Sequence, residues 1–101
     1  MRFLIKTTIL TEAGNAAVRD GSIGEKAMRI IKEQKPEAVY FVEEGGQRTQ
    51  YLVVNMDSAN QLPSIAEPWW LTFGGTVEIH QAMTPEDLEQ AGLEGIAKTW
   101  A

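Results

Sequence analysis

The residues best suited to chemistry in this chain are its single histidine and the acid two positions before it. His80 is the only imidazole in 101 residues, and Glu78 shares its face of an expected strand because side chains alternate along a strand. Lys6, on a neighbouring expected strand, could reach the pair. A carboxylate beside a half-buried imidazole can tune a general base near neutral pH. We take His80 as the candidate catalytic base, oriented by Glu78; the alternative is a polar cluster satisfied across a subunit interface.

Two tyrosines and the same lysine are candidate ligand-binding residues on this face. Tyr40 and Tyr51 could stack on an aromatic ligand or donate a hydrogen bond to an oxyanion, with Lys6 beside them. The alternative is interface packing, in which both hydroxyls stay solvated and no ligand is needed.

The tryptophans supply a further candidate ligand contact. Trp69 and Trp70 follow Pro68 in an expected extended segment, where neighbouring side chains point in opposite directions. One indole therefore enters the core and the other faces a pocket or a second subunit. Trp69 is the candidate ligand contact, although the pattern does not decide which of the two faces outward. Trp100 is expected to anchor the C-terminal tail on a partner or on the sheet edge.

Composition excludes several classes of function. With no cysteine and one histidine, the chain lacks the residues for thiolate metal sites, iron–sulfur clusters or imidazole clusters, so no metal and no cofactor is expected. The net charge of −5 disfavours binding to nucleic acid or to an anionic membrane surface. No apolar run is long enough to span a membrane. Lys6 interrupts the apolar start, which predicts a first strand rather than a signal peptide, and a cytoplasmic location is the default expectation.

Hydrophobic periodicity and turn residues predict the first half of the chain. Residues 2–10 have strand character, and residues 12–21 are expected to form a short helical turn. A helix is expected to begin at Ser22, in a capping box with Glu25, and to end at Pro36. Residues 38–44 and 47–56 flank Gly45-Gly46, a strong hairpin signal.

The second half adds one helix, one strand and a tail. Asp57 or Ser58 can cap a helix that Pro63 is expected to kink and Pro68 to end. A strand follows over residues 76–83, and Thr84 caps a C-terminal helix. The order β-α-β-β-α-β predicts a single α+β domain, residues 1–101, with a ferredoxin-like antiparallel sheet in the strand order 4-1-3-2.

The two-residue loop fixes the register of the hairpin and therefore the two faces of the sheet. It sets Glu43 opposite Arg48 and Tyr40 opposite Tyr51, both favourable cross-strand pairs. One face is expected to pack against the helices: Phe3, Ile5, Ile9, Val39, Phe41, Leu52, Val54, Val77 and Ile79. The other is half apolar and half polar: Leu4, Lys6, Thr8, Tyr40, Val42, Thr49, Tyr51, Val53, Asn55, Glu78, His80 and Ala82. Such a face needs cover, and a second copy packed sheet on sheet across a two-fold axis supplies it most simply.

Five segments carry a resemblance to a known group of proteins: residues 36–41, 45–49, 53–58, 65–69 and 83–88. They resemble small bacterial proteins of the dimeric α/β-barrel superfamily, which also holds muconolactone isomerase-like proteins, cofactor-independent antibiotic-biosynthesis monooxygenases and stress-responsive barrel proteins. The resemblance implies a homodimer whose sheets close into a barrel, with a small-molecule pocket in each subunit. No active-site motif of a characterised branch can be placed on this chain.

Two functions stay open on the sequence. The first is a cofactor-independent enzyme, isomerase-like or monooxygenase-like, that acts on a small apolar or aromatic molecule. The second is a non-catalytic protein that binds a small ligand or serves as a dimeric interaction module. A pocket lined by His80, Glu78 and a tryptophan would favour the first, and its absence the second.

Overall fold

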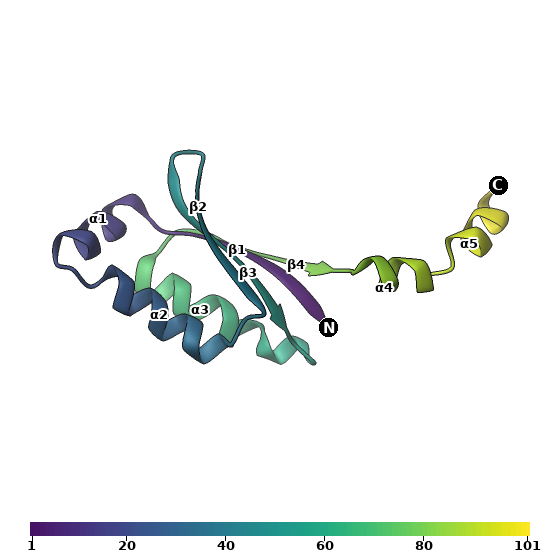
Figure 1. Ribbon diagram of the computed structural model, residues 1–101, viewed down its shortest axis with the longest axis horizontal. Helices are drawn as coiled ribbons and strands as arrows, with labels where there is room; N and C mark the ends of the chain where they lie inside the picture. Colours follow the sequence, from purple (N-terminus) through teal and green to yellow (C-terminus); the bar gives the residue numbers. More distant parts are fainter.

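A computed structural model describes all residues from Met1 to Ala101 as a four-stranded sheet with helices on one side and a helical extension at the C-terminal end (Figure 1). The strands are β1 (Arg2–Thr8), β2 (Ala38–Glu44), β3 (Gln47–Asn55) and β4 (Val77–Ala82). The helices are α1 (Thr11–Arg19), α2 (Ile23–Gln34), the 3₁₀ turn η1 (Ala59–Gln61), α3 (Leu62–Phe73), α4 (Pro85–Gln90) and α5 (Leu93–Trp100).

The sheet has the order β2-β3-β1-β4 with antiparallel neighbours throughout. This confirms the predicted ferredoxin-like α+β fold and the order 4-1-3-2. The hairpin register is also as predicted, with Tyr40 opposite Tyr51 and Glu43 opposite Arg48. Gly45 and Gly46 have φ of 60° and 77°, the left-handed backbone that a two-residue hairpin turn needs.

The core lies between the sheet and the helices α2 and α3. Its buried members come from both layers: Ile5, Ile9, Ala27, Ile30, Leu52, Val54, Met56, Ile65, Trp69 and Phe73. The rings of Trp69 and Phe73 stack at a centroid distance of 6.1 Å. One expected core residue is placed differently: Phe41 is 58% exposed, because β2 is an edge strand and α2 does not close over it. The prediction of Phe41 as a core residue was therefore wrong.

Helix α3 contradicts the expected roles of both of its prolines. Pro63 lies in the first turn, where a missing N–H costs no helical bond, and so it does not kink the helix. Pro68 lies inside the helix, which continues to Phe73. A proline at this position leaves the carbonyl of Ser64 without its helical donor, and the Gln34 side-chain amide donates to that oxygen at 3.2 Å. Trp69 and Trp70 therefore lie on a helix, not on an extended segment.

Helix α2 begins and ends where expected, but its first turn is capped differently. Ser22 is the N-cap residue, yet its side chain makes no capping hydrogen bond and its Oγ is buried without a partner. The carboxylate of Asp20 accepts a hydrogen bond from the Ser22 backbone N–H at 2.8 Å, and its interactions with the side chain and the backbone of Ser22 hold the pKa of Asp20 below its usual value. This turn places the backbone of Ser22 in a helical conformation, so the predicted capping box with Glu25 does not form.

The C-terminal segment 83–101, here called the arm, leaves the body of the protein. Thr84 and Asp87 cap α4 reciprocally, as predicted for Thr84: Asp87 N–H donates to Thr84 Oγ1 at 3.1 Å, and Asp87 accepts from Thr84 N–H at 2.9 Å. The backbone bond lowers the pKa of Asp87. Gly92, with φ 74°, then separates α4 from α5, so the expected single tail helix is two. Figure 1 shows the arm extending beyond the sheet, and the radius of gyration is 17.0 Å, against about 13 Å for a compact chain of this length.

No helix of the structure combines the length and the apolar character needed to cross a membrane.

Candidate functional site

The face of the sheet opposite α2 and α3, here called the open face, carries the chemistry-bearing residues that the sequence singled out. Lys6 lies between Tyr51 of β3 and Glu78 of β4, and Leu4 lies between Val53 and His80. The helices cover only the other face in Figure 1. The predicted candidates are thus brought to one surface by strand register alone.

Charged and polar groups on the open face form one continuous cluster. Lys6 pairs with Glu44 and lies 3.5 Å from Glu78 Oε2, and Glu78 Oε1 lies 4.0 Å from His80 Nε2. The Tyr51 hydroxyl donates to Glu44. The bond to Glu44 raises the pKa of Lys6 and the pKa of Tyr51, and the same bonds lower the pKa of Glu44. Glu44 was absent from the sequence-based candidates, although its place opposite Gln47 follows from the hairpin register.

The aromatic candidates are split between the two faces. Tyr40 is 67% exposed on the open face, beside Tyr51. Trp69 is 1% exposed in the core, where its indole N–H donates to Gln34 Oε1 at 3.1 Å. Trp70 is the partly exposed indole of the pair. Helical spacing, rather than strand alternation, separates the two indoles, and Trp69 lies away from the open-face cluster.

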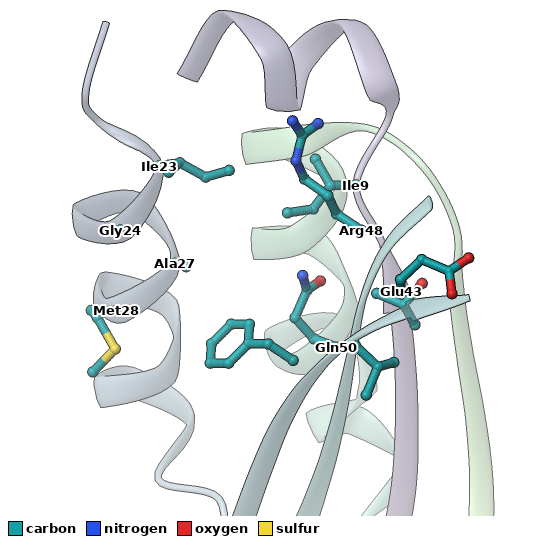
Figure 2. A pocket seen from close by; sticks show the side chains of 11 residues that line it. Ile9, Ile23, Gly24, Ala27, Met28, Glu43, Arg48 and Gln50 are labelled. Carbon is teal, nitrogen blue, oxygen red and sulfur yellow. The ribbon is translucent and has the colours of Figure 1, made fainter. Parts of the chain in front are cut away.

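A pocket of about 440 Å³ lies on the opposite side of the sheet, between α2 and the β2–β3 hairpin. Most of its wall is apolar and its mouth is edged by the exposed side chains of Met28 and Phe41. The lining residues are Ile9, Ile23, Gly24, Ala27, Met28, Phe41, Val42, Glu43, Arg48, Thr49 and Gln50. Figure 2 shows the side chains of Ile23 and Gln50 reaching into the space between the helix and the hairpin, whereas the carboxylate of Glu43 points away from it.

Gln50 is the polar group at the floor of this pocket. It is 3% exposed, and its Oε1 accepts a hydrogen bond from Thr7 Oγ1 at 2.8 Å. The bond fixes the amide oxygen toward β1, and the amide projects into the pocket in Figure 2. The oxygen keeps a second lone pair, but the bond holds it toward β1, so the group that the amide presents to the pocket is its NH₂, a donor.

Arg48 supplies a second donor at one end of the pocket. Its Nη2 donates to Asn15 Oδ1 at 3.0 Å, which turns the guanidinium toward α1. The predicted cross-strand pair therefore does not form an ion pair, and the Glu43 carboxylate instead accepts from Gly46 N–H at 2.7 Å. Gly14 of α1 allows this approach, because a Cβ there would lie 2.5 Å from Arg48 Nη1.

The sequence held one signal for this pocket. Gln50 falls on the helix-facing side of a strand, directly opposite Phe41. A polar side chain at an inward position is expected to have a specific partner or a ligand.

Comparisons with known proteins bear on the fold. No family model matches the chain, and no curated protein matches it. A solved structure of 5-chloro-2-hydroxyhydroquinone dehydrochlorinase from Burkholderia phenoliruptrix, in complex with 2,5-dihydroxybenzoquinone, is similar with a TM-score of 0.66 and 11% identity over 85% of this chain and 97% of that chain. A de novo designed protein, Ferredog-Diesel, has a TM-score of 0.47 and 13% identity, over 80% of this chain and 85% of that chain. The likeness to the dehydrochlorinase supports the ferredoxin-like α+β fold of this chain.

Proposed function

We propose that this protein binds a small, mostly apolar or aromatic molecule with an oxygen acceptor in the pocket between α2 and the β2–β3 hairpin. The observation that carries the proposal is the Gln50 amide, which is nearly buried in an apolar pocket and turns its donor side away from Thr7. A carbonyl, phenolate or carboxylate oxygen would accept from Gln50, and Arg48 adds a positive charge at the end of the pocket.

The size and composition of the pocket support this class of ligand. A volume of about 440 Å³ is in the range typical of small-molecule sites, which combine apolar walls with a few placed polar groups. The dehydrochlorinase with the similar fold has, by its name, an oxygen-bearing aromatic substrate. That likeness extends to the fold, and the pocket chemistry of this chain carries the ligand class.

Titration with 2,5-dihydroxybenzoquinone as acceptor-bearing probe, and with benzylamine as donor-only probe, tests the proposal. The quinone is expected to bind and benzylamine is not. Gln50→Leu is expected to weaken quinone binding about tenfold, the loss of one hydrogen bond worth roughly 1.4 kcal/mol. Ile23→Trp, which fills the pocket and leaves Gln50 intact, is expected to abolish binding. Calorimetry measures both effects.

The matched control is Gln81→Leu, the same change at an exposed position of β4. It should bind the quinone with the affinity of the unaltered protein. Near-ultraviolet circular dichroism verifies that each variant is folded, because Gln50→Leu also removes the partner of Thr7. Equal quinone affinity in the Gln50→Leu variant and its control, or no quinone binding by the unaltered protein, would contradict the proposal.

We further propose that the protein is a homodimer through the open face. Leu4, Tyr40 and Val42 leave apolar surface exposed beside the Lys6 cluster, a mixture that a second copy of the same face would cover. Tyr40→Asp is expected to shift the sedimenting species from dimer to monomer, because it places a charge in the packed layer. The control Leu71→Asp changes a still more exposed apolar residue on the helix side and should remain dimeric. A monomeric unaltered protein at micromolar concentration would overturn the dimer.

Catalysis at His80 is the second candidate function. The observation that favours it is the cluster in which Glu78 lies between Lys6 and His80. In the proposed dimer this cluster would be partly desolvated, the setting in which a carboxylate–imidazole pair acts as a general base. Because His80 lies on the other face of the sheet from the pocket, His80→Ala is expected to leave quinone affinity at the pocket unchanged and to abolish any conversion of a probe that binds at the open face; unchanged conversion would remove His80 as the base.

A further inference from the structure

The arm presents an apolar stripe that nothing in its own chain covers. Leu93, Ile96 and Trp100 follow the spacing of one helical face, and Trp100 is 82% exposed. Every residue from position 85 to position 101 is exposed, and the hydrogen bonds of α4 and α5 stay within the arm. Helices of six and eight residues are too short to persist alone in water, where about 12–15 residues are already marginal. The arm therefore needs a surface to pack on.

The mouth of the ligand pocket is a second uncovered apolar surface. Met28 is 45% and Phe41 58% exposed, although each borders the largely apolar pocket. A ligand buried in the pocket would leave this rim in water. Contact between the rim and the arm would therefore bury apolar surface on both.

Within one subunit, the arm and the pocket mouth lie at opposite ends of the sheet. The last residue of β4, Ala82, pairs with Arg2, which in turn pairs with Asn55, at the end of the sheet farthest from the Gly45-Gly46 turn. The pocket lies at the turn end, beside Glu43 and Arg48. Figure 1 shows the arm continuing away from the hairpin, and the molecule measures 59 Å along this direction. The arm is directed away from the pocket of its own subunit.

We propose that the arm of each subunit packs over the pocket mouth of a second copy, so that the ligand site is complete only in the dimer. Face-to-face packing about a two-fold axis that runs across the strands brings the arm end of one sheet to the turn end of the other. The arm then passes around the sheet to the helix side, where the pocket opens beside the edge strand β2. The contact is then made twice and closes on itself, as an isologous interface must. This inference extends the proposed ligand function, because it names the partner's Trp100 stripe as the cover of the pocket.

Charge favours the same pairing. The arm carries four acids and one lysine: Glu86, Asp87, Glu89, Glu94 and Lys98. Helix α2 and its C-cap carry four basic residues against two acids: Lys26, Arg29, Lys32, Lys35, Glu25 and Glu33. An acidic amphipathic helix against an apolar rim on a basic helix is a helix-in-groove contact with complementary charge.

Disulfide trapping tests the arm position directly, because the chain has no cysteine of its own. Ala97→Cys places a thiol beside the stripe and keeps Trp100. Gly24→Cys places one on the pocket wall, where an added Cβ meets nothing within 4 Å. When the two single variants are mixed and oxidised without ligand, a cross-linked heterodimer is expected. Its yield should exceed by about tenfold or more that of Ala97→Cys mixed with Glu33→Cys, the control on the other side of α2.

Each other result overturns the arm position. Preferential linkage to the Glu33→Cys variant would place the arm on the side of α2 that faces away from the pocket. Linkage of Ala97→Cys only to itself would mean that the arms pair with each other. In a chain that carries both Ala97→Cys and Gly24→Cys, a disulfide within one chain would mean that the arm folds back on its own subunit. Introducing Trp100→Ala into the Ala97→Cys chain is expected to reduce the heterodimer yield by about tenfold, the loss expected for an interface anchor. The cross-linking is done without ligand, so a failure of the quinone to bind would not change the cross-linking result. A failure to cross-link would likewise leave the quinone titration unaffected.

Discussion

Replacing Gly75 with alanine is expected to destabilise the protein by about 3 kcal/mol or more. Gly75 has φ 89°, and a Cβ there would lie 2.1 Å from the carbonyl oxygen of Thr8. Left-handed backbone costs an alanine about 1–2 kcal/mol, and the displacement of packed backbone costs a further 1–3 kcal/mol or so. Thr8 cannot move freely, because its N–H donates to Thr76 O at 2.9 Å and its hydroxyl accepts from Thr76 N–H at 2.9 Å. Urea denaturation measures the change in the free energy of unfolding.

Gly46→Ala separates backbone strain from the close approach. Gly46 has φ 77°, but an added Cβ meets nothing within 4 Å. This control should lose only the cost of the left-handed conformation, about 1–2 kcal/mol. Equal losses at the two glycines would mean that the approach of Gly75 to Thr8 does not constrain the junction of β1 and β4.

Trp69→Ala is expected to cost about 3–5 kcal/mol, the range for removing a large buried aromatic side chain. Trp69 is 1% exposed, stacks on Phe73 and donates to Gln34. Gln34 also donates to the carbonyl of Ile65 at 2.8 Å, so the loss of the indole disturbs the contact between α2 and α3. Thermal and urea unfolding, followed by far-ultraviolet circular dichroism, measure the loss.

Two variants sharpen the Trp69 experiment. Trp70→Ala, the same change one residue along the helix at a partly exposed side chain, should stay within about 1 kcal/mol of the unaltered protein. Trp69→Phe keeps most of the ring and removes the N–H, and should cost about 1 kcal/mol for the hydrogen bond together with a smaller packing loss. A similar effect at both tryptophans would contradict the assignment of Trp69 to the core.

Local sequence signals sufficed for the sheet and its register. Gly45-Gly46 selects a two-residue turn, and that turn places Tyr40 opposite Tyr51 without information from elsewhere in the chain. The cap at Thr84 was predictable for the same reason, since its partner Asp87 is three residues away. Lys6, Glu78 and His80 share the open face because strand alternation and the strand order together place them there.

The features that the sequence did not reveal depend on distant residues. Pro68 stays inside α3 because Gln34, from another helix, supplies a donor to the carbonyl that the proline leaves free. Ser22 loses its capping bond because Asp20 holds its backbone N–H in a competing turn. The pocket exists because α2 stands apart from the exposed Phe41, a spacing set by the packing of the whole helical layer.

The bond between Thr7 and Gln50 also determines which molecules the pocket should refuse. With its oxygen held by the Thr7 hydroxyl, the amide cannot rotate to offer an acceptor without breaking a buried bond. A protonated amine at that point would have no lone pair to accept from the Gln50 NH₂, and its charge would be repelled by the Arg48 cation at the end of the pocket. The site is therefore built to select against basic compounds, and its discrimination originates in a hydroxyl on the adjacent strand that no ligand needs to touch.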